Sequence, residues 1–81
     1  MKKIHIKLKE ILKERNMTQA QLAALANIRP SAVSNLCRNY VDRVAIEHIE
    51  KICNALALES VSDLFELVDI LEDIDDENPL N

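Results

Sequence analysis

The chain has 81 residues, no glycine, and only two aromatic residues, Tyr40 and Phe65. A chain of this length forms one domain near the lower size limit for a self-sufficient core, and a core of Leu, Ile, Val and Ala favours a helical bundle. No apolar run approaches the roughly 18 residues of a membrane span, and the charged N-terminus does not match a signal peptide. We therefore expect a cytoplasmic protein in which Cys37 and Cys53 are reduced thiols.

Charge is distributed unevenly along the chain. Residues 1–51 hold all ten Lys and Arg residues against five acids, a balance of +5, whereas residues 52–81 hold nine acids and no basic residue. This division says more about binding than the overall net charge of −4. We expect one domain over residues 1–70 and an acidic C-terminal tail over residues 71–81, whose simplest role is to keep the protein in solution.

A first helix is expected over residues 4–15. Its apolar stripe has helical spacing and consists of Ile4, Leu8, Ile11 and Leu12. Strand-like alternation of apolar and polar residues is confined to the first few residues of the chain. In a helix that begins here, His5 would be a solvated residue at the frayed start.

Residues 17–39 are typical of two short helices joined by a tight turn. Thr18 is expected to cap a helix over residues 19–26, and Pro30 to open a second helix that ends near Arg38. Apolar residues at helical spacing would pack the two helices together: Leu22, Ala23, Ala26, Ile28, Val33 and Leu36. The residues between them are short and polar, which suits a helix face that reads base edges: Ser31, Ser34 and Asn35.

Asn residues stand where the helices are expected to stop. Asn16, Asn27 and Asn39 each follow a predicted helix, and Asn is the residue other than Gly that best tolerates a positive φ. A chain without Gly would therefore make these three turns with Asn.

Two further helices are expected downstream. The first covers residues 45–56 and would turn Ile46, Ile49, Ile52 (or Cys53) and Leu56 toward the core. The second would begin at a capping box formed by Ser60 and Asp63 and extend to about residue 73. Its apolar residues keep helical spacing: Leu64, Leu67, Val68, Leu71 and Ile74. This stripe would either form a dimer contact or pack on the domain's own core.

The stretch at residues 17–39 resembles the helix-turn-helix of phage repressors of the Cro/C1 (Xre-like) class. The matching residues are Thr18, Gln19, Leu22, Ala23, Asn27, Ile28, Val33, Ser34 and Leu36. The resemblance extends over residues 4–68 and implies an all-α, compact, five-helix, λ-repressor-like DNA-binding domain, with the helix-turn-helix at helices 2 and 3. Many relatives have a buried Arg–Glu pair where this chain has Leu12 and Cys37, and packed apolar groups can replace such a pair without loss of the fold.

The resemblance implies a transcriptional regulator, such as a phage-like repressor, that binds a double-stranded DNA operator as a homodimer. The side chains expected to contact bases are Arg29, Ser31, Ser34, Asn35 and Arg38. Those expected to contact the DNA backbone are Thr18, Gln19, Asn39, Tyr40 and Arg43. Among them, Asn35 could pair bidentately with adenine, and Arg29 and Arg38 could reach guanine or phosphate. Arg29 is a poor N-cap, so it is either kept for DNA or merely tolerated.

Other interpretations remain open. The polar face of the third helix could be an exposed surface without a ligand, and the chain could be a protein-interaction or autoinhibited module that acts through its acidic tail. We expect no enzyme, cofactor or small-molecule substrate, because no catalytic constellation or Gly-rich phosphate loop is present. We expect no metal site either, because Cys37, His48 and Cys53 lack the spacing of zinc ligands.

Overall fold

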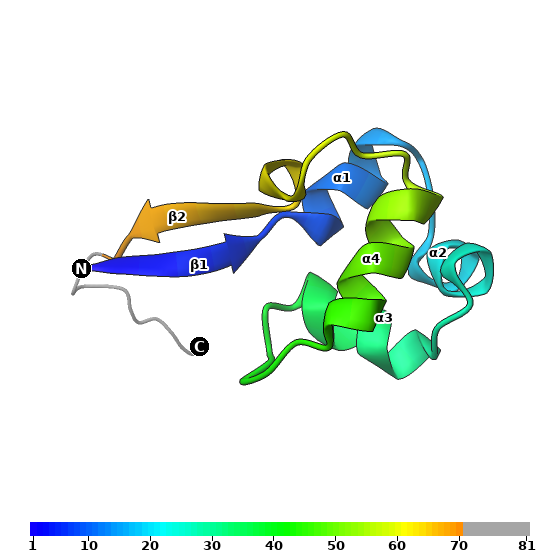
Figure 1. The fold of residues 1–81 in the computed structure, drawn as a ribbon, viewed down its shortest axis with the longest axis horizontal. Coiled ribbons are helices and arrows are strands. Elements are labelled where there is room, and N and C mark those ends of the chain that lie inside the picture. The colour runs from blue at the N-terminus through cyan, green and yellow to red at the C-terminus, as the bar shows by residue number, and fades with distance from the viewer. Residues whose placement is uncertain (71–81) are drawn as a thin grey trace.

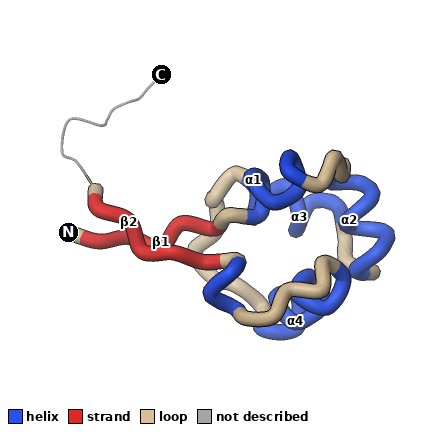
Figure 2. Tube along the Cα trace, turned by 90° about the horizontal axis from the view of Figure 1, so that it is seen from above, coloured by secondary structure: helices blue, strands red, loops and turns tan. Residues whose placement is uncertain are grey.

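The structure is a computed structural model that describes residues 1–70, so the expected tail at residues 71–81 lies outside it. The elements of the described residues are four α-helices, one short 3₁₀ turn and two strands. In chain order they are β1 (Lys2–Ile6), α1 (Leu8–Glu14), α2 (Gln19–Ala26), α3 (Pro30–Cys37), α4 (Ile46–Ala55), the 3₁₀ turn (Val61–Asp63) and β2 (Phe65–Asp69). The strands project from one end of the helical body (Figures 1 and 2).

The two strands pair the beginning of the domain with its end. They run antiparallel, with Lys2 opposite Asp69 and Ile6 opposite Phe65. A 2.8 Å ion pair joins the side chains of Lys2 and Asp69. The Ile70 N–H donates to the Met1 carbonyl at 2.9 Å. The backbone groups on the facing edges of both strands are therefore satisfied by a partner 59 to 67 residues away in the sequence.

The expectation of an all-α, five-helix domain is wrong at both ends of the chain. The first helix begins at Leu8 instead of residue 4, and the expected fifth helix is a single 3₁₀ turn followed by β2. The difference is explained by pairing between the two segments. Ile6 and Leu64 are both buried in the core, and strand pairing satisfies the backbone from Lys2 to Ile6 and from Phe65 to Asp69. Leu67, part of the predicted helical stripe, is 64% exposed on β2, and residues 71 and 74 of that stripe lie outside the described residues.

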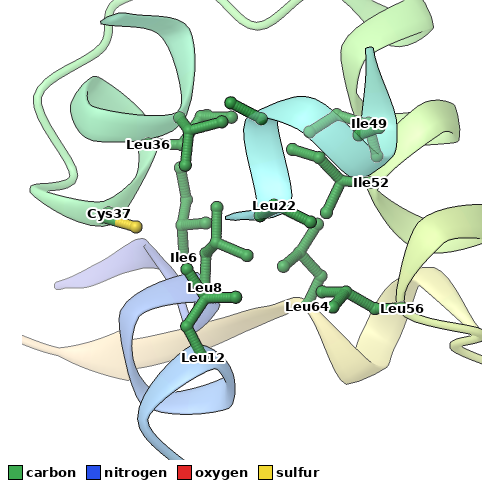
Figure 3. Packing of buried hydrophobic residues seen from close by; sticks show 13 residues of the cluster. Ile6, Leu8, Leu12, Leu22, Leu36, Cys37, Ile49, Ile52, Leu56 and Leu64 are labelled. Carbon is green, nitrogen blue, oxygen red and sulfur yellow. The ribbon is translucent and has the colours of Figure 1, made fainter. Parts of the chain in front are cut away.

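The core draws on every helix and on both strand regions (Figure 3). The largest fully buried side chains are Leu8, Leu22, Ile52, Leu56, Leu64 and Val33. Most predicted core positions of the first three helices are confirmed, including Leu12 and Cys37, and Ile11 and Ile28 are partly buried. Ile4 was expected in the apolar stripe of the first helix but lies on β1 and is 60% exposed. Ile46 was expected in the core and is 73% exposed, because it is the first residue of α4 and lies one turn before the buried stripe of Ile49 and Ile52.

Within residues 1–70, four residues adopt a left-handed backbone, and none of them is a glycine. Asn16, Asn27 and Asn39 have φ angles of 54°, 57° and 57°, which confirms the three predicted Asn turns. The fourth is Ala57, with a φ of 54°, directly after the C-terminal end of α4. This turn could not be predicted from the sequence, because alanine has no preference for a positive φ.

Within residues 1–70, no helix is both long enough and apolar enough to cross a membrane.

Candidate nucleic-acid interface

The first helix of the motif, α2, begins with a complete capping box. Thr18 has an extended backbone, and its Oγ1 accepts a hydrogen bond from the Gln21 N–H at 3.0 Å. In return the Gln21 Oε1 accepts from the Thr18 N–H at 2.8 Å. This confirms Thr18 as the N-cap and adds Gln21, which the sequence analysis missed although it lies at the third helical position of the pattern. Gln19 is exposed at the first residue of α2.

A tight turn then sets the angle between α2 and α3. Asn27 ends α2 in the left-handed conformation, and the Ile28 N–H donates to the Ala23 carbonyl at 3.0 Å. The Ile28 side chain packs against the core, while Ala23 is 4% exposed between the helices. Small and apolar residues at this corner thus fix the position of α3 on the domain, and the predicted turn is confirmed.

The second helix, α3, has one buried face and one polar face. Val33, Leu36 and Cys37 are 0%, 4% and 3% exposed and anchor the helix. The opposite face presents residues at helical spacing: Ser31, Ser34, Asn35 and Arg38. Four of the five predicted base-contacting residues therefore share one face of one helix, and its firm anchoring keeps that face in a defined position.

Arg29 and Pro30 form the entry to α3. Pro30 occupies the first turn of the helix, as predicted, and Arg29 is the N-cap residue. The Arg29 side chain makes no capping hydrogen bond and is exposed. Its guanidinium is therefore available to a ligand that approaches the N-terminal end of α3.

Asn35, Arg38 and Tyr40 form a cluster at the other end of α3. The Arg38 Nη2 donates to the Asn35 Oδ1 at 3.0 Å. The Arg38 guanidinium carbon lies 5.4 Å from the centroid of the Tyr40 ring, within cation–π range. All three residues were predicted to contact DNA, but in separate roles. The contact between Asn35 and Arg38 could have been predicted from their i, i+3 spacing, which makes two side chains neighbours on a helix.

Asn39 connects the end of the motif to β1. Its Oδ1 accepts from the Ile6 N–H at 2.6 Å, and its Nδ2 donates to the Ile6 carbonyl at 3.1 Å. The side chain is half-buried, and the backbone is left-handed. Asn39 was expected to contact the DNA backbone. In the structure its side-chain amide instead forms two hydrogen bonds with the backbone of Ile6, as a neighbouring strand would.

Arginine charge on this side of the molecule is not neutralised within the described residues. Among residues 1–70, the side chains that form ion pairs with carboxylates are Lys2, His5 and Lys51. Arg29, Arg38 and Arg43 have no carboxylate within 4.0 Å in this part of the chain. Unpaired guanidinium groups beside a polar helix face suit a polyanion, because each can neutralise a phosphate or donate to a base.

The two cysteines and Glu47 have shifted pKa values with simple physical causes. Burial raises the pKa of the Cys37 and Cys53 thiols, which favours their protonated and unreactive form, and both are free cysteines. A hydrogen bond from Lys51 lowers the pKa of Glu47. Among residues 1–70, no group of three His, Cys, Asp or Glu side chains is placed to hold a metal ion.

Comparison with known proteins agrees with this geometry. A family model for the Cro/C1-type HTH DNA-binding domain matches residues 7–73, which is most of the chain and includes α1 to β2. No curated protein matches the sequence.

Proposed function

The chain belongs to the family of Cro/C1-type helix-turn-helix DNA-binding domains, and from this premise we propose that it is a sequence-specific transcriptional regulator, a phage-like repressor that reads an operator in the major groove with α3. One observation carries the proposal: the polar face of Ser31, Ser34, Asn35 and Arg38 lies on a helix whose opposite face is fully anchored in the core. Such a face can approach base edges without a change in the fold. As a DNA-binding regulator the protein would act in the cytoplasm.

The side chains divide into two roles in this proposal. Arg29 and the polar face of α3 would contact bases, while Thr18, Gln19, Tyr40 and Arg43 would hold the module on the phosphate backbone. The N-terminus of α2 supports the second role, because the capping box uses the Gln21 N–H and leaves the amides of Gln19 and Ala20 without a partner within the helix. Asn39 would support the backbone contacts by fixing the loop that presents Tyr40, since its own amide is bonded to Ile6.

Selection of bound sequences from a random DNA pool tests this function. We expect one enriched motif, and we expect the Asn35→Ala, Arg38→Ala double variant to bind that motif at least tenfold more weakly, because a good bidentate contact contributes about 1–3 kcal/mol. Lys13→Ala is a matched control, since it removes an exposed positive charge from α1, outside the helix-turn-helix (Figure 1). Equal binding by the double variant and the parent would contradict the proposal.

We further propose that the protein binds as a homodimer, because one module covers few base pairs and useful affinity usually needs two. The supporting feature is a cross-strand pair on the projecting sheet, Ile4 and Leu67, which are 60% and 64% exposed and lie opposite each other. Replacing both with Thr keeps the strand propensity and removes the apolar contact. Sedimentation analysis should then show monomers, whereas Val61→Thr, at a residue that is 56% exposed elsewhere, should leave the dimer intact.

A second candidate function, autoinhibition by the acidic segment, is favoured by the charge balance. Residues 1–70 carry ten basic and nine acidic residues, while residues 71–81 carry five acids and no basic residue. The segment follows directly after β2 and has the charge to compete with DNA for Arg29, Arg38 and Arg43.

A further inference from the structure

Arg38 is held more firmly than its position predicts. It is the exposed C-cap residue of α3, where an arginine would ordinarily sample many rotamers. Instead its guanidinium donates to Asn35 on one side and lies over the Tyr40 ring. The fixed guanidinium is therefore preorganised for a ligand, since less rotamer freedom is lost when the ligand binds.

Tyr40 has no place in the core that would explain its position. It is 74% exposed, yet its backbone is fixed relative to α3, because its N–H donates to the Asn35 carbonyl at 2.9 Å. The left-handed turn at Asn39 brings the chain back over the end of the helix at this point. The structure places the Tyr40 ring beneath the Arg38 guanidinium, 5.4 Å from its central carbon.

The hydrogen bond also fixes which way the Asn35 amide points. A guanidinium can only donate, so the atom that faces Arg38 must be Oδ1, and the Nδ2 group must point away from it. Bidentate pairing with adenine would require both amide atoms to face the base. In this cluster Oδ1 is engaged with Arg38, and Nδ2 remains as a donor.

We propose that Asn35, Arg38 and Tyr40 act as one unit that reads a guanine in the operator. Arg38 donates to guanine O6 and N7 with the part of its fork that Asn35 leaves free. Tyr40 is a positioning residue beneath the guanidinium, and Asn35 both holds Arg38 and offers Nδ2 to an acceptor on the neighbouring base. This inference rests on the proposed DNA-binding function and replaces the adenine contact expected for Asn35.

The experiment uses the full chain and the motif enriched from the random pool. Each guanine of the motif is replaced in turn by 7-deazaguanine, which lacks the N7 acceptor but keeps Watson–Crick pairing. We expect one guanine per half-site at which the parent loses about fivefold or more in affinity, whereas Arg38→Ala shows no further loss there. Arg38→Lys should keep only part of the sensitivity, because an ammonium can still donate to guanine N7 or O6 but lacks the planar fork.

Tyr40 variants separate positioning from a merely structural role. Tyr40→Phe keeps the ring face and should retain the full sensitivity to 7-deazaguanine, whereas Tyr40→Leu should lose most of it while its unfolding midpoint stays unchanged. A phosphate role for Arg38 gives a different result: no guanine shows Arg38-dependent sensitivity, and Arg38→Ala lowers the salt slope of binding by about 1. That result overturns the guanine reading but leaves the proposed function intact. A pool with no enriched sequence overturns both.

Discussion

At the scale of single residues, Asn39 joins parts of the molecule that are far apart in the sequence. Its amide bonds both polar backbone groups of Ile6, and its φ of 57° is costly for most other residues. We expect Asn39→Ala to lower the free energy of unfolding by about 2–4 kcal/mol, from two lost hydrogen bonds and a strained turn. Asn39→Gly should lose less, because glycine tolerates the turn.

Urea denaturation of both variants measures this effect. Asn16→Ala is the matched control, because Asn16 has a φ of 54° but no side-chain hydrogen bond within the described residues. It should lose only about 1–2 kcal/mol from the turn. Equal losses for Asn16→Ala and Asn39→Ala would show that the bonds to Ile6 contribute no net stability.

His5 and Glu10 link β1 to α1 in a way that depends on pH. Their side chains lie 2.8 Å apart. His5 lies half-buried on β1, so the expectation of a solvated residue at the frayed start of a helix is wrong. The hydrogen bond from His5 lowers the pKa of Glu10. The link therefore adds stability above the unfolded Glu pKa of about 4.3, and this stability is lost as the pH falls through the lower folded value.

The pH dependence can be measured as a difference between two proteins. The unfolding free energies of the parent and of Glu10→Gln should differ most near neutral pH, and the gap should close as the pH falls through the folded pKa of Glu10. Because Glu10 is largely exposed, the gap should be small. A gap that widens toward acid would contradict the assignment.

At the scale of elements, the end of α4 has a turn that the sequence does not favour. Ala57 adopts a φ of 54°, and the Leu58 N–H donates to the Cys53 carbonyl at 2.9 Å to close the helix. We expect Ala57→Gly to raise the free energy of unfolding by about 1 kcal/mol, because glycine removes the steric cost of the left-handed backbone. Thermal unfolding provides the measurement. Ala24→Gly, at an exposed position inside α2, should instead lower the free energy of unfolding by about 0.5–1 kcal/mol.

The helical elements of the fold could be predicted because their signals are local. Caps, Pro30 and the three Asn residues mark the ends of α2 and α3, and the sequence placed these helices correctly. The strands could not be predicted in the same way. Ile4 and Leu8 have helical spacing, Ile4 and Ile6 have strand spacing, and a short apolar run does not distinguish the two. The partner that decides between them, residues 65–69, is distant in the sequence.

The candidate site could be predicted as a set of residues but not as an arrangement. Spacing alone places Ser31, Ser34 and Asn35 on one face, which the structure confirms for α3. The bond from Arg38 to Asn35 depends on rotamers, and the contact with Tyr40 depends on the turn at Asn39. Neither is specified by a periodic pattern.

At the scale of the whole molecule, the described residues are nearly neutral, so attraction to DNA must be local. Residues 71–81 carry five acids. If this segment covers the arginines, we expect its removal to tighten DNA binding by about tenfold at low salt. The gain should vanish at high salt, where charges are strongly screened. Fluorescence anisotropy with the enriched motif measures the affinities. A variant with the five acids changed to Asn or Gln separates charge from chain length. A gain below about twofold at low salt would favour a plain solubilising tail.

The pairing of β1 with β2 has a consequence for the order in which the protein is made. A chain synthesised from its N-terminus can form α1 to α4 early, but Lys2–Ile6 must wait for Phe65–Asp69. Leu64, which is fully buried, also arrives late. The domain can therefore complete its fold only after nearly all of its described residues have been synthesised. A chain that stops before residue 64 lacks both a part of its core and the partner of its first strand. Pairing of the two strands is thus the last step in forming the described DNA-binding fold.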